Sequence, residues 1–367
     1  MPHELVRVNE VDLHVCTRCS AACPYCYVGR DDHCNEVFND LPPIGDTEIL
    51  KRIIRNIHCS ARPETIVFVG GDPCQHPDLV SLLSYVKSLG GPTGGMSVAV
   101  LSNTHVYRNG GNPVGIESIV PYVDELDFTL HGIGVEHDKR NRDCGSYKAA
   151  MNQLRRFVAV RKQDQAVAIV LNFVPYTMTH LEEMMSGVAK EIGMVPGLDY
   201  FTVQRIAPTG EAAKDYDQWK VMNLNEALGT MEKFCERTGF EVKIDAIDAF
   251  PICAVDSKYW YMLNSGGCKW GQPDGVLSVI QDGGIQRCAL SERILGNFLE
   301  MDTPRKFTEF MMDNPTLKAF MDCVHLDEKC KQCWVLDKCR GGCVIAAGNG
   351  DPYKTDCITV GHDYLAR

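Results

Sequence analysis

Eighteen cysteines in a chain of 367 residues constrain this protein more than any other feature. In a small secreted protein such a count would indicate disulfides. This chain is large and shows no secretory signal, and thiols stay reduced in the cytoplasm. Metal ligation is then the better interpretation. Residues 263–367 have little apolar periodicity apart from a predicted helix at 304–322, so metal sites would also have to stabilise their fold.

Strand and helix patterns alternate through the first two hundred or so residues. Short apolar or β-branched runs predict strands at 11–15, 65–69, 96–102, 126–130, 166–173 and 200–206. Amphipathic stretches predict helices at 46–58, 78–90, 146–161 and 179–193, with Asp46 and Thr179 as N-caps. Six such units predict an α/β fold with a parallel sheet. Because eight units make a complete barrel, six favour an open, partial (β/α)6 TIM-like barrel.

The character of the sequence changes near residue 216. A helix is predicted at 223–238 and a short strand at 241–244, and cysteines and glycines dominate from 263 onward. We therefore expect a partial barrel at 1–215, a bridging helix and strand at 216–262, and a cysteine-rich domain at 263–367.

Charge and hydropathy exclude some classes of partner. The formal net charge of −11 is spread along the chain without a basic stripe, so a nucleic acid is not expected as substrate. No apolar run is long enough to cross a bilayer, so a membrane is not expected as a partner. We expect a cytoplasmic protein.

A cysteine triplet follows the first predicted strand. Cys19, Cys23 and Cys26 stand in the segment CSAACPYC, in the loop after the strand, where α/β barrels place their chemistry. Three thiolates leave one iron of a cubane cluster without a protein ligand, and a small molecule can then chelate that iron. The alternative is a structural zinc site with Cys16 as its fourth ligand.

The spacing Cys-x3-Cys-x2-Cys, with the aromatic Tyr25 before the third cysteine, resembles the signature of the radical S-adenosylmethionine (SAM) superfamily. The resemblance implies a [4Fe–4S] cluster whose open iron binds the amino and carboxylate groups of SAM. It further implies one-electron cleavage of SAM to a 5′-deoxyadenosyl radical, which abstracts hydrogen from a substrate, and an electron donor such as flavodoxin or ferredoxin.

Later positions resemble the SAM-binding pattern of the same family. They are Gly70, Gly71, Asp72 and Pro73 after the second strand, Ser102, Asn103 and Thr104 after the third, Thr129 on the fourth, and Arg140 and Arg142. The resemblance implies that the glycine turn meets the SAM amino group and that Thr129 contacts SAM. It implies that one arginine meets the SAM carboxylate, and the spacing leaves both open. Residues 102–104 would reach the ribose or cap a loop.

Seven further cysteines form a second pattern. They are Cys268, Cys288, Cys330, Cys333, Cys339, Cys343 and Cys357. A zinc ribbon built from the two nearest pairs would leave three of them unexplained. The pattern resembles the SPASM domain, which implies two auxiliary [4Fe–4S] clusters, the first on Cys268, Cys288 and Cys343 and the second on Cys330, Cys333, Cys339 and Cys357. The first then lacks a fourth ligand. Either its fourth iron stays open or Asp274 closes it, although a solvent-facing Asp274 is the simpler interpretation.

Together the two resemblances imply a radical SAM/SPASM peptide maturase of the oxidoreductase type. Such an enzyme forms a thioether or carbon–carbon crosslink in a ribosomally synthesised peptide, or epimerises a residue. Sulfatase-maturating relatives carry an aspartate after the cysteine that matches Cys288. Here Ala289 stands there, which disfavours formylglycine formation. A small-molecule enzyme of cofactor biosynthesis is the second hypothesis. An electron carrier is disfavoured, because the glycine turn and the open iron would serve no purpose in one.

Two expectations concern the substrate and the chemistry. The first strand begins near residue 11, so we expect a separate leader-recognition protein, or the barrel itself, to bind the leader of a peptide or protein substrate. Among the cysteines outside both patterns, Cys74 and Cys144 are the candidate hydrogen-atom donors.

Overall fold

The structure is a computed structural model that describes most of the chain. The described residues are 4–29, 36–90, 95–103, 114–161, 164–173, 178–192, 200–219, 224–239, 243–246, 249, 251–263, 268–324, 326 and 328–345. Two positions singled out above, Thr104 and Cys357, lie outside the described residues.

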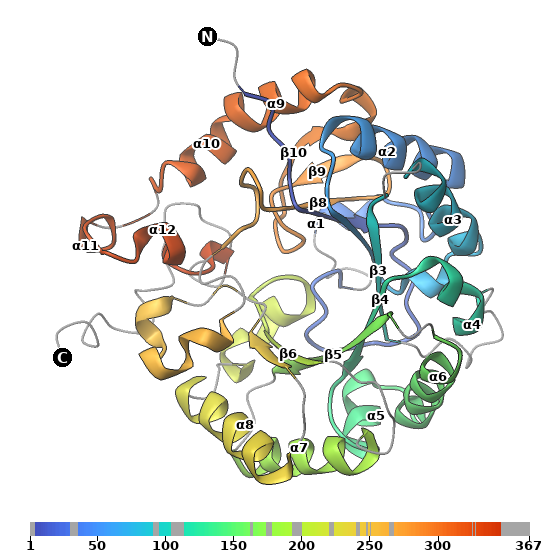
Figure 1. The fold of residues 1–367 in the computed structure, drawn as a ribbon, viewed down its shortest axis with the longest axis vertical. Coiled ribbons are helices and arrows are strands. Elements are labelled where there is room, and N and C mark those ends of the chain that lie inside the picture. Colours follow the sequence, from blue (N-terminus) through green and yellow to red (C-terminus); the bar gives the residue numbers. More distant parts are fainter. Residues whose placement is uncertain are drawn as a thin grey trace.

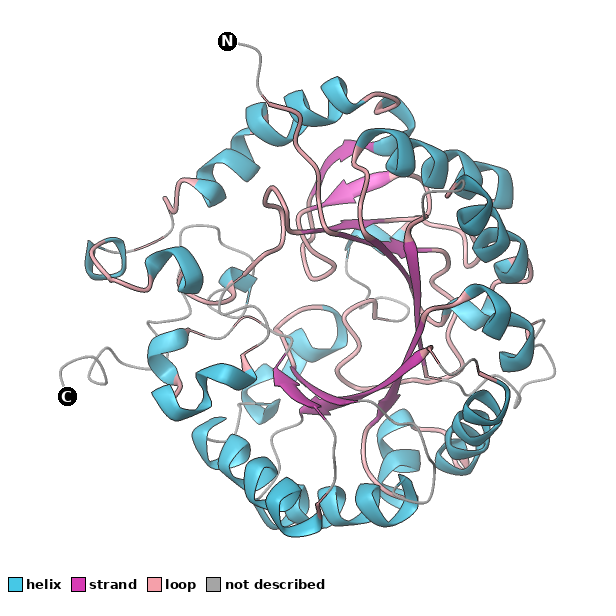
Figure 2. Cartoon of the chain, in the orientation of Figure 1, coloured by secondary structure: helices cyan, strands magenta, loops and turns pink. Residues whose placement is uncertain are grey.

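One curved sheet forms the centre of the described chain (Figure 2). Its strands are β1 (Glu10–His14), β2 (Thr65–Val69), β3 (Ser97–Ser102), β4 (Glu125–Leu130), β5 (Ala166–Phe173), β6 (Tyr200–Arg205), β7 (Lys243–Ala246), β8 (Val276–Val279), β9 (Gly284–Gln286) and β10 (Ile294–Asn297). They lie in the order β10-β9-β8-β1-β2-β3-β4-β5-β6-β7. All neighbouring strands in the run β8-β1-β2-β3-β4-β5-β6-β7 are parallel. Strand β9 is antiparallel to β8, and β10 is antiparallel to β9.

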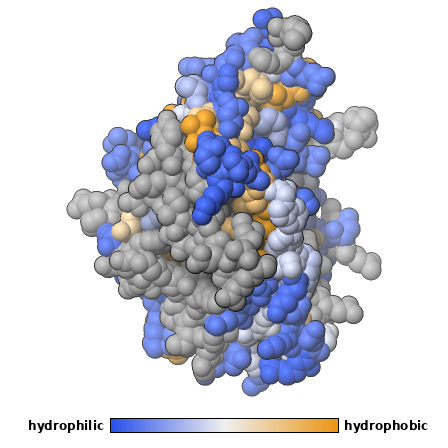
Figure 3. Space-filling model, turned by 90° about the vertical axis from the view of Figure 1, so that its left-hand side faces the viewer, coloured by the Kyte–Doolittle hydropathy of each residue, from blue (hydrophilic) through white to orange (hydrophobic). Residues whose placement is uncertain are grey.

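The helices are α1 (Glu36–Asn39), α2 (Thr47–Ser60), α3 (Leu79–Leu89), α4 (Ile116–Ile119), α5 (Val135–Asn141), α6 (Ser146–Val160), α7 (Met178–Ile192), α8 (Leu224–Thr238), α9 (Pro304–Asp313), α10 (Pro315–Met321), α11 (Glu328–Lys331) and α12 (Leu336–Cys339). Helices α2 to α9 lie around the convex side of the sheet, whereas α11 and α12 lie at its open side (Figure 1). None of the helices within the described ranges is long and apolar enough to cross a membrane. The described surface on the side of α11 and α12 is mainly hydrophilic, and its apolar residues gather in a narrow band (Figure 3).

The predicted fold class, a partial parallel α/β barrel followed by a cysteine-rich region, is confirmed. All six predicted strands of the barrel form, and β2 and β5 have the predicted bounds. The structure adds β7 beside β6 and β8 beside β1, both parallel, so each edge of the sheet is extended by residues from beyond the six units. The domain boundaries after residues 215 and 262 stay a prediction.

Local signals account for where the helices start and stop. Asp46 caps α2 as predicted, because its carboxylate accepts hydrogen bonds from the backbone N–H groups of Glu48 and Ile49. Thr179 is not an N-cap, since the helical backbone of α7 already begins at Met178. The single helix predicted at 304–322 is two helices, because Pro315 cannot continue α9 and instead starts α10 behind an Asn314 cap.

The main hydrophobic core lies between the sheet and the helices. Leu50, Ile53 and Ile57 of α2 are fully buried with Leu13 of β1 and Phe68 of β2. The same core includes Phe298 and Phe307, which follow the C-terminal strands. Residues from beyond position 276 are therefore packed into the barrel rather than tethered beside it.

Asn56 ties α2 to this C-terminal segment. Its Nδ2 donates to the carbonyl oxygen of Phe298 over 2.7 Å, and the residue is 3% exposed. We predict that Asn56→Ala lowers the free energy of unfolding by about 1 to 2 kcal/mol, because a buried hydrogen bond is lost and a small void remains. Asn152→Ala, on the exposed side of α6, should change it by less than about 0.5 kcal/mol. Anaerobic urea unfolding measures both, and equal values would contradict the prediction.

Candidate active site

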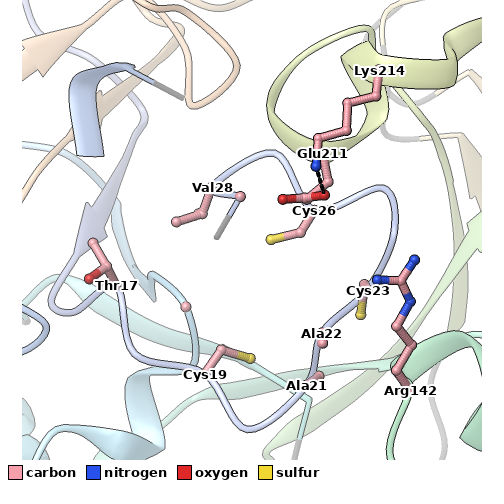
Figure 4. Close-up of a pocket in the computed structure, with 12 residues that line it drawn as sticks. Thr17, Cys19, Ala21, Ala22, Cys23, Cys26, Val28, Arg142, Glu211 and Lys214 are labelled. Atoms are coloured by element: carbon pink, nitrogen blue, oxygen red, sulfur yellow. Dashed lines mark hydrogen bonds and ion pairs between the residues drawn. The ribbon is translucent and has the colours of Figure 1, made fainter. Parts of the chain in front are cut away.

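The predicted cysteine triplet lines a cavity at the end of β1. Cys19, Cys23 and Cys26 surround about 340 Å³ of space, together with Gly71 and Arg142 (Figure 4). Within the described residues, no group of three His, Cys, Asp or Glu side chains converges on one metal ion. The sulfur atoms are thus spaced around a volume rather than a point. That arrangement suits a cubane cluster better than a single zinc ion.

Cys16, the possible fourth zinc ligand, does not join the triplet in lining the cavity. It is fully buried, and its thiol donates to the carbonyl oxygen of Asp72 over 3.1 Å. Burial raises the pKa of the Cys16 thiol to about 12. The geometry therefore disfavours zinc.

The Gly70–Pro73 turn after β2 packs directly on the cysteine loop. Gly71 N–H donates to the carbonyl oxygen of Cys16, and Asp72 N–H donates to that of Arg18, each over 2.8 Å. A Cβ on Gly71 would lie 2.3 Å from the Arg18 carbonyl oxygen, so only glycine permits this approach. Asp72 then caps the single 3-10 turn that Pro73 begins.

Asp72 is a fully buried carboxylate with one oxygen to spare. Its Oδ1 accepts from the Ser102 hydroxyl over 2.9 Å and from Cys74 N–H over 3.0 Å. Burial raises the pKa of Asp72 to about 6, although these two hydrogen bonds oppose the rise. Its Oδ2 has no hydrogen-bond partner among the described residues, although Asp72 is not among the residues that line the cavity.

Polar side chains that the sequence analysis missed hold the triplet. The Cys23 thiol donates to Asn141 Oδ1 over 3.2 Å and lies 3.8 Å from His131 Nε2. Asn141 also contacts His137 Nε2 over 2.6 Å. His131 follows β4, and His137 and Asn141 belong to α5. The segment after β4 therefore contacts the cysteine loop after β1 through hydrogen bonds. Hydrogen bonds to cysteine sulfurs are among the factors that set cluster potentials.

The positions expected to contact SAM lie in different settings. Asn103 Nδ2 donates to Cys19 Sγ over 3.0 Å, whereas the buried Ser102 hydroxyl serves Asp72. Thr129 lies half-buried on β4, on the opposite face from the core residue Phe128. Tyr25 is buried, and its ring meets His131 edge-on with centroids 5.2 Å apart.

The structure separates the two candidate arginines. Arg142 ends α5 in a left-handed conformation and lines the cavity. Arg140 is 9% exposed and does not line it, and burial lowers its pKa. Arg142 therefore lies at the cavity and Arg140 does not, while the arginine that meets the SAM carboxylate stays a prediction.

Neither candidate hydrogen-atom donor lines this cavity. Cys74 is fully buried in the main core, and burial raises the pKa of its thiol well above the usual range. Cys144 is exposed just before α6. A role for either thiol would need a substrate or a motion that reaches beyond the cavity.

The described cysteines of the C-terminal pattern lie in three apolar clusters, with Cys330 packed against Leu326 apart from the others. Cys268, Cys288 and Cys343 pack in one cluster with Phe320. Cys333 and Cys339 pack around Ile252, and Ile252 N–H donates to Cys339 Sγ over 3.3 Å. Cys333 N–H donates to the carbonyl oxygen of Cys330. Cys357, the remaining cysteine of the second pattern, lies outside the described residues.

Two cysteines that match no ligand position, Cys253 and Cys323, pack against Cys330. The sequence spacing gave no signal for the contact of Cys253, because it joins segments far apart in the chain. Asp274 is solvent-facing, with its side chain 69% exposed and 3.5 Å from Arg7 Nε.

The concave face of the sheet carries carboxyl groups that the sequence analysis also missed. Glu10 and Asp12 of β1 and Asp127 of β4 alternate with residues that face the core. Burial, and next the neighbouring carboxylates, raises the pKa of all three. The alternation in EVDLH and ELDFTL is the signal that would have revealed them.

The comparisons with known proteins agree with this geometry. Residues 13–186 match the sequence model of the radical SAM superfamily. An S-adenosylmethionine-dependent nucleotide dehydratase of Selenomonas ruminantium is 35% identical over 81 residues, which cover 22% of this chain but only 26% of that enzyme. The PqqA peptide cyclase of Methylorubrum extorquens strain PA1 is 22% identical over 355 residues, which cover 92% of this chain and 81% of that enzyme.

Solved structures share the fold over nearly the whole chain. SuiB of Streptococcus suis bound to S-adenosylmethionine aligns with a TM-score of 0.69 at 14% identity. The alignment covers 96% of this chain and 77% of the SuiB chain. The anSMEcpe enzyme with bound AdoMet and a Cp18Cys peptide aligns with a TM-score of 0.64 at 14% identity. The alignment covers 97% of this chain and 93% of the anSMEcpe chain. The likeness thus extends through the cysteine-rich C-terminal region.

The fold is that of a partial-barrel enzyme, and its cavity lies at the loop after the first strand. Residues 13–186, somewhat less than half of the chain, match the radical SAM superfamily, so the chain contains a radical SAM domain.

The pKa of Asp72 makes stability depend on pH. A carboxyl with a pKa of about 3.8 when unfolded and about 6 when folded favours the folded state least at high pH. We predict that the free energy of unfolding of the ligand-free protein falls by about 2 kcal/mol between pH 4 and 6.5 through this group alone. Asp72→Asn should remove that part of the fall.

Urea unfolding of the wild type and of Asp72→Asn across this pH range isolates the carboxyl. As the pH rises, the free energy of unfolding of the wild type should fall relative to that of Asp72→Asn. A difference that does not change with pH would contradict the assignment.

Proposed function

We propose that this protein is a radical SAM peptide maturase with one SAM-binding [4Fe–4S] cluster on Cys19, Cys23 and Cys26 and two auxiliary clusters in the C-terminal region. The observation that carries the proposal is the cavity that the three cysteines line together with Gly71 and Arg142. The orphaned oxygen of the buried Asp72 adds a place for a cationic group. When bound, the cluster and SAM supply a carbon radical that abstracts hydrogen from the substrate.

The residues around the cavity have complementary roles. Gly71 and Asp72 fix the turn against the cysteine loop, and Asn103 and Asn141 hold the sulfurs of Cys19 and Cys23. Asp72 and Arg142 carry opposite charges that match the ammonium and the carboxylate of SAM. Thr129 is proposed to contact SAM, because it matches a family position with that role and lies on β4.

Several relatives named for peptides support a peptide substrate. The PqqA cyclase and SuiB with its precursor peptide SuiA both align along most of this chain. Ala289 stands where sulfatase-maturating relatives have an aspartate, so we favour an oxidative crosslink, thioether or carbon–carbon, or an epimerisation over formylglycine formation. The formal net charge of −11 favours a substrate with neutral or basic groups.

An oxidative crosslink also gives the C-terminal cysteines a purpose. The substrate radical must lose an electron, and auxiliary clusters offer a path for it to an external carrier such as flavodoxin or ferredoxin. A separate protein that presents the leader of the substrate peptide completes the proposed set of partners.

The first experiment tests the cavity. We predict that Cys19→Ala, Cys23→Ala and Cys26→Ala each abolish reductive cleavage of SAM by dithionite-reduced protein and lower the iron content by one cluster, because each removes a thiolate ligand. Cys59→Ala, on the exposed side of α2, is the matched control and should keep both properties. Retained 5′-deoxyadenosine formation in the three variants would refute the proposal.

The second experiment tests the substrate. We predict that the reconstituted enzyme modifies a short peptide encoded beside its own gene. Crosslinking removes a pair of hydrogen atoms, and epimerisation in D2O instead adds a deuterium to the α-carbon. Mass spectrometry separates these products. SAM cleavage that stays uncoupled from every such peptide, but is stimulated by a small metabolite, would favour the cofactor-biosynthesis alternative.

A further inference from the structure

A buried arginine lies among the three cysteines of the proposed first auxiliary cluster. Arg287 follows β9 and is 6% exposed. Its Nη1 lies 3.5 Å from Cys268 Sγ, and its Nη2 lies 3.9 Å from Cys288 Sγ. Its guanidinium carbon lies 4.4 Å from the centre of the Phe320 ring. Among the described residues, no carboxylate forms an ion pair with it.

This cation needs an anion that the side chains alone do not supply. A guanidinium remains charged in a protein, and burying it without a counter-charge is costly. Neutral thiols are only weak hydrogen-bond acceptors. Thiolates that ligate a metal cluster would provide the missing negative charge.

The fold fixes the arginine in this position. A Cβ on Gly271 would lie 2.3 Å from Arg287 Cγ, so the glycine leaves room for the aliphatic stem. The β8–β9 pairing holds the backbone on one side, and the Phe320 ring covers the guanidinium on the other. Arg287 is therefore held against the sulfurs rather than free to reach solvent.

We propose that Arg287 is a positioning residue that raises the reduction potential of the auxiliary cluster held by Cys268, Cys288 and Cys343. The proposal rests on the auxiliary clusters of the proposed function. A fixed positive charge with N–H groups aimed at ligand sulfurs stabilises the reduced cluster, which carries one more negative charge than the oxidised cluster. The cluster then accepts an electron from the substrate side more readily.

The test compares three variants of the full-length chain, each reconstituted anaerobically. Arg287→Met removes the charge and keeps much of the volume. Arg287→Lys keeps the charge but loses the planar fork that faces both sulfurs. Arg293→Met is the matched control, because it removes a charge from the exposed surface of the same segment. Iron per chain and an EPR-monitored redox titration are measured for each variant.

We expect Arg287→Met to keep its iron and to shift one cluster signal to lower potential by at least a tenfold change in the reduction equilibrium, about 59 mV for a one-electron couple. Arg287→Lys should shift the same signal by less, and Arg293→Met should leave it in place. Unchanged signals at full iron content in Arg287→Met would overturn the proposal while leaving the auxiliary clusters intact.

Two further outcomes are decisive. If Arg287→Met loses the iron of this site, the reduction potential of the cluster in Arg287→Lys becomes the test. A potential in Arg287→Lys equal to that of the wild type would overturn the proposal. If the wild type binds only the iron of the SAM cluster, the auxiliary clusters of the proposed function fail first, and the inference about Arg287 falls with them.

Discussion

The docking of one backbone turn on another is the contact on which the rest of the site depends. Gly71 and Asp72 donate to the carbonyl oxygens of Cys16 and Arg18, at a separation that leaves no space for a Cβ on Gly71. This contact fixes the start of the cysteine loop relative to β2. It also buries Asp72 beside that loop, which raises its pKa and leaves one of its oxygens without a hydrogen-bond partner among the described residues. A larger side chain at position 71 would displace the cysteines and the carboxylate together.

Local sequence signals were enough to predict the barrel. The runs at 65–69 and 166–173 are apolar and β-branched, as buried parallel strands require, and they form β2 and β5 with the predicted bounds. Asp46 acts as a cap because a cap needs only its own side chain and the next backbone N–H groups. The pairing of β8 with β1 was not predictable in this way, since it joins residues more than 260 positions apart and leaves no periodic mark. The break at Pro315 was readable and was overlooked.

The site was predictable to the extent that it follows from spacing. The triplet and the glycine turn are sequence-local, and the structure brings them to one cavity. The contacts of Asn141 and His131 with Cys23 depend on how the loop after β4 meets the loop after β1. Single polar residues in loops carry no such information. The choice between Arg140 and Arg142 likewise depends on the left-handed residue that ends α5, which turns Arg142 toward the cavity.

The C-terminal cysteines lie where the two edges of the open barrel come together. The sheet does not close on itself, and its edges are β7 and β10. Ala207 and Ala249, which follow β6 and β7, pack in the same cluster as Cys268 and Cys288, which flank β8 and β9. A metal cluster on these cysteines would therefore join both edges of the sheet, with Arg287 balancing its charge from within. Because a link between distant segments restricts the unfolded chain more than a local one does, such a cluster would stabilise the barrel as well as the C-terminal region.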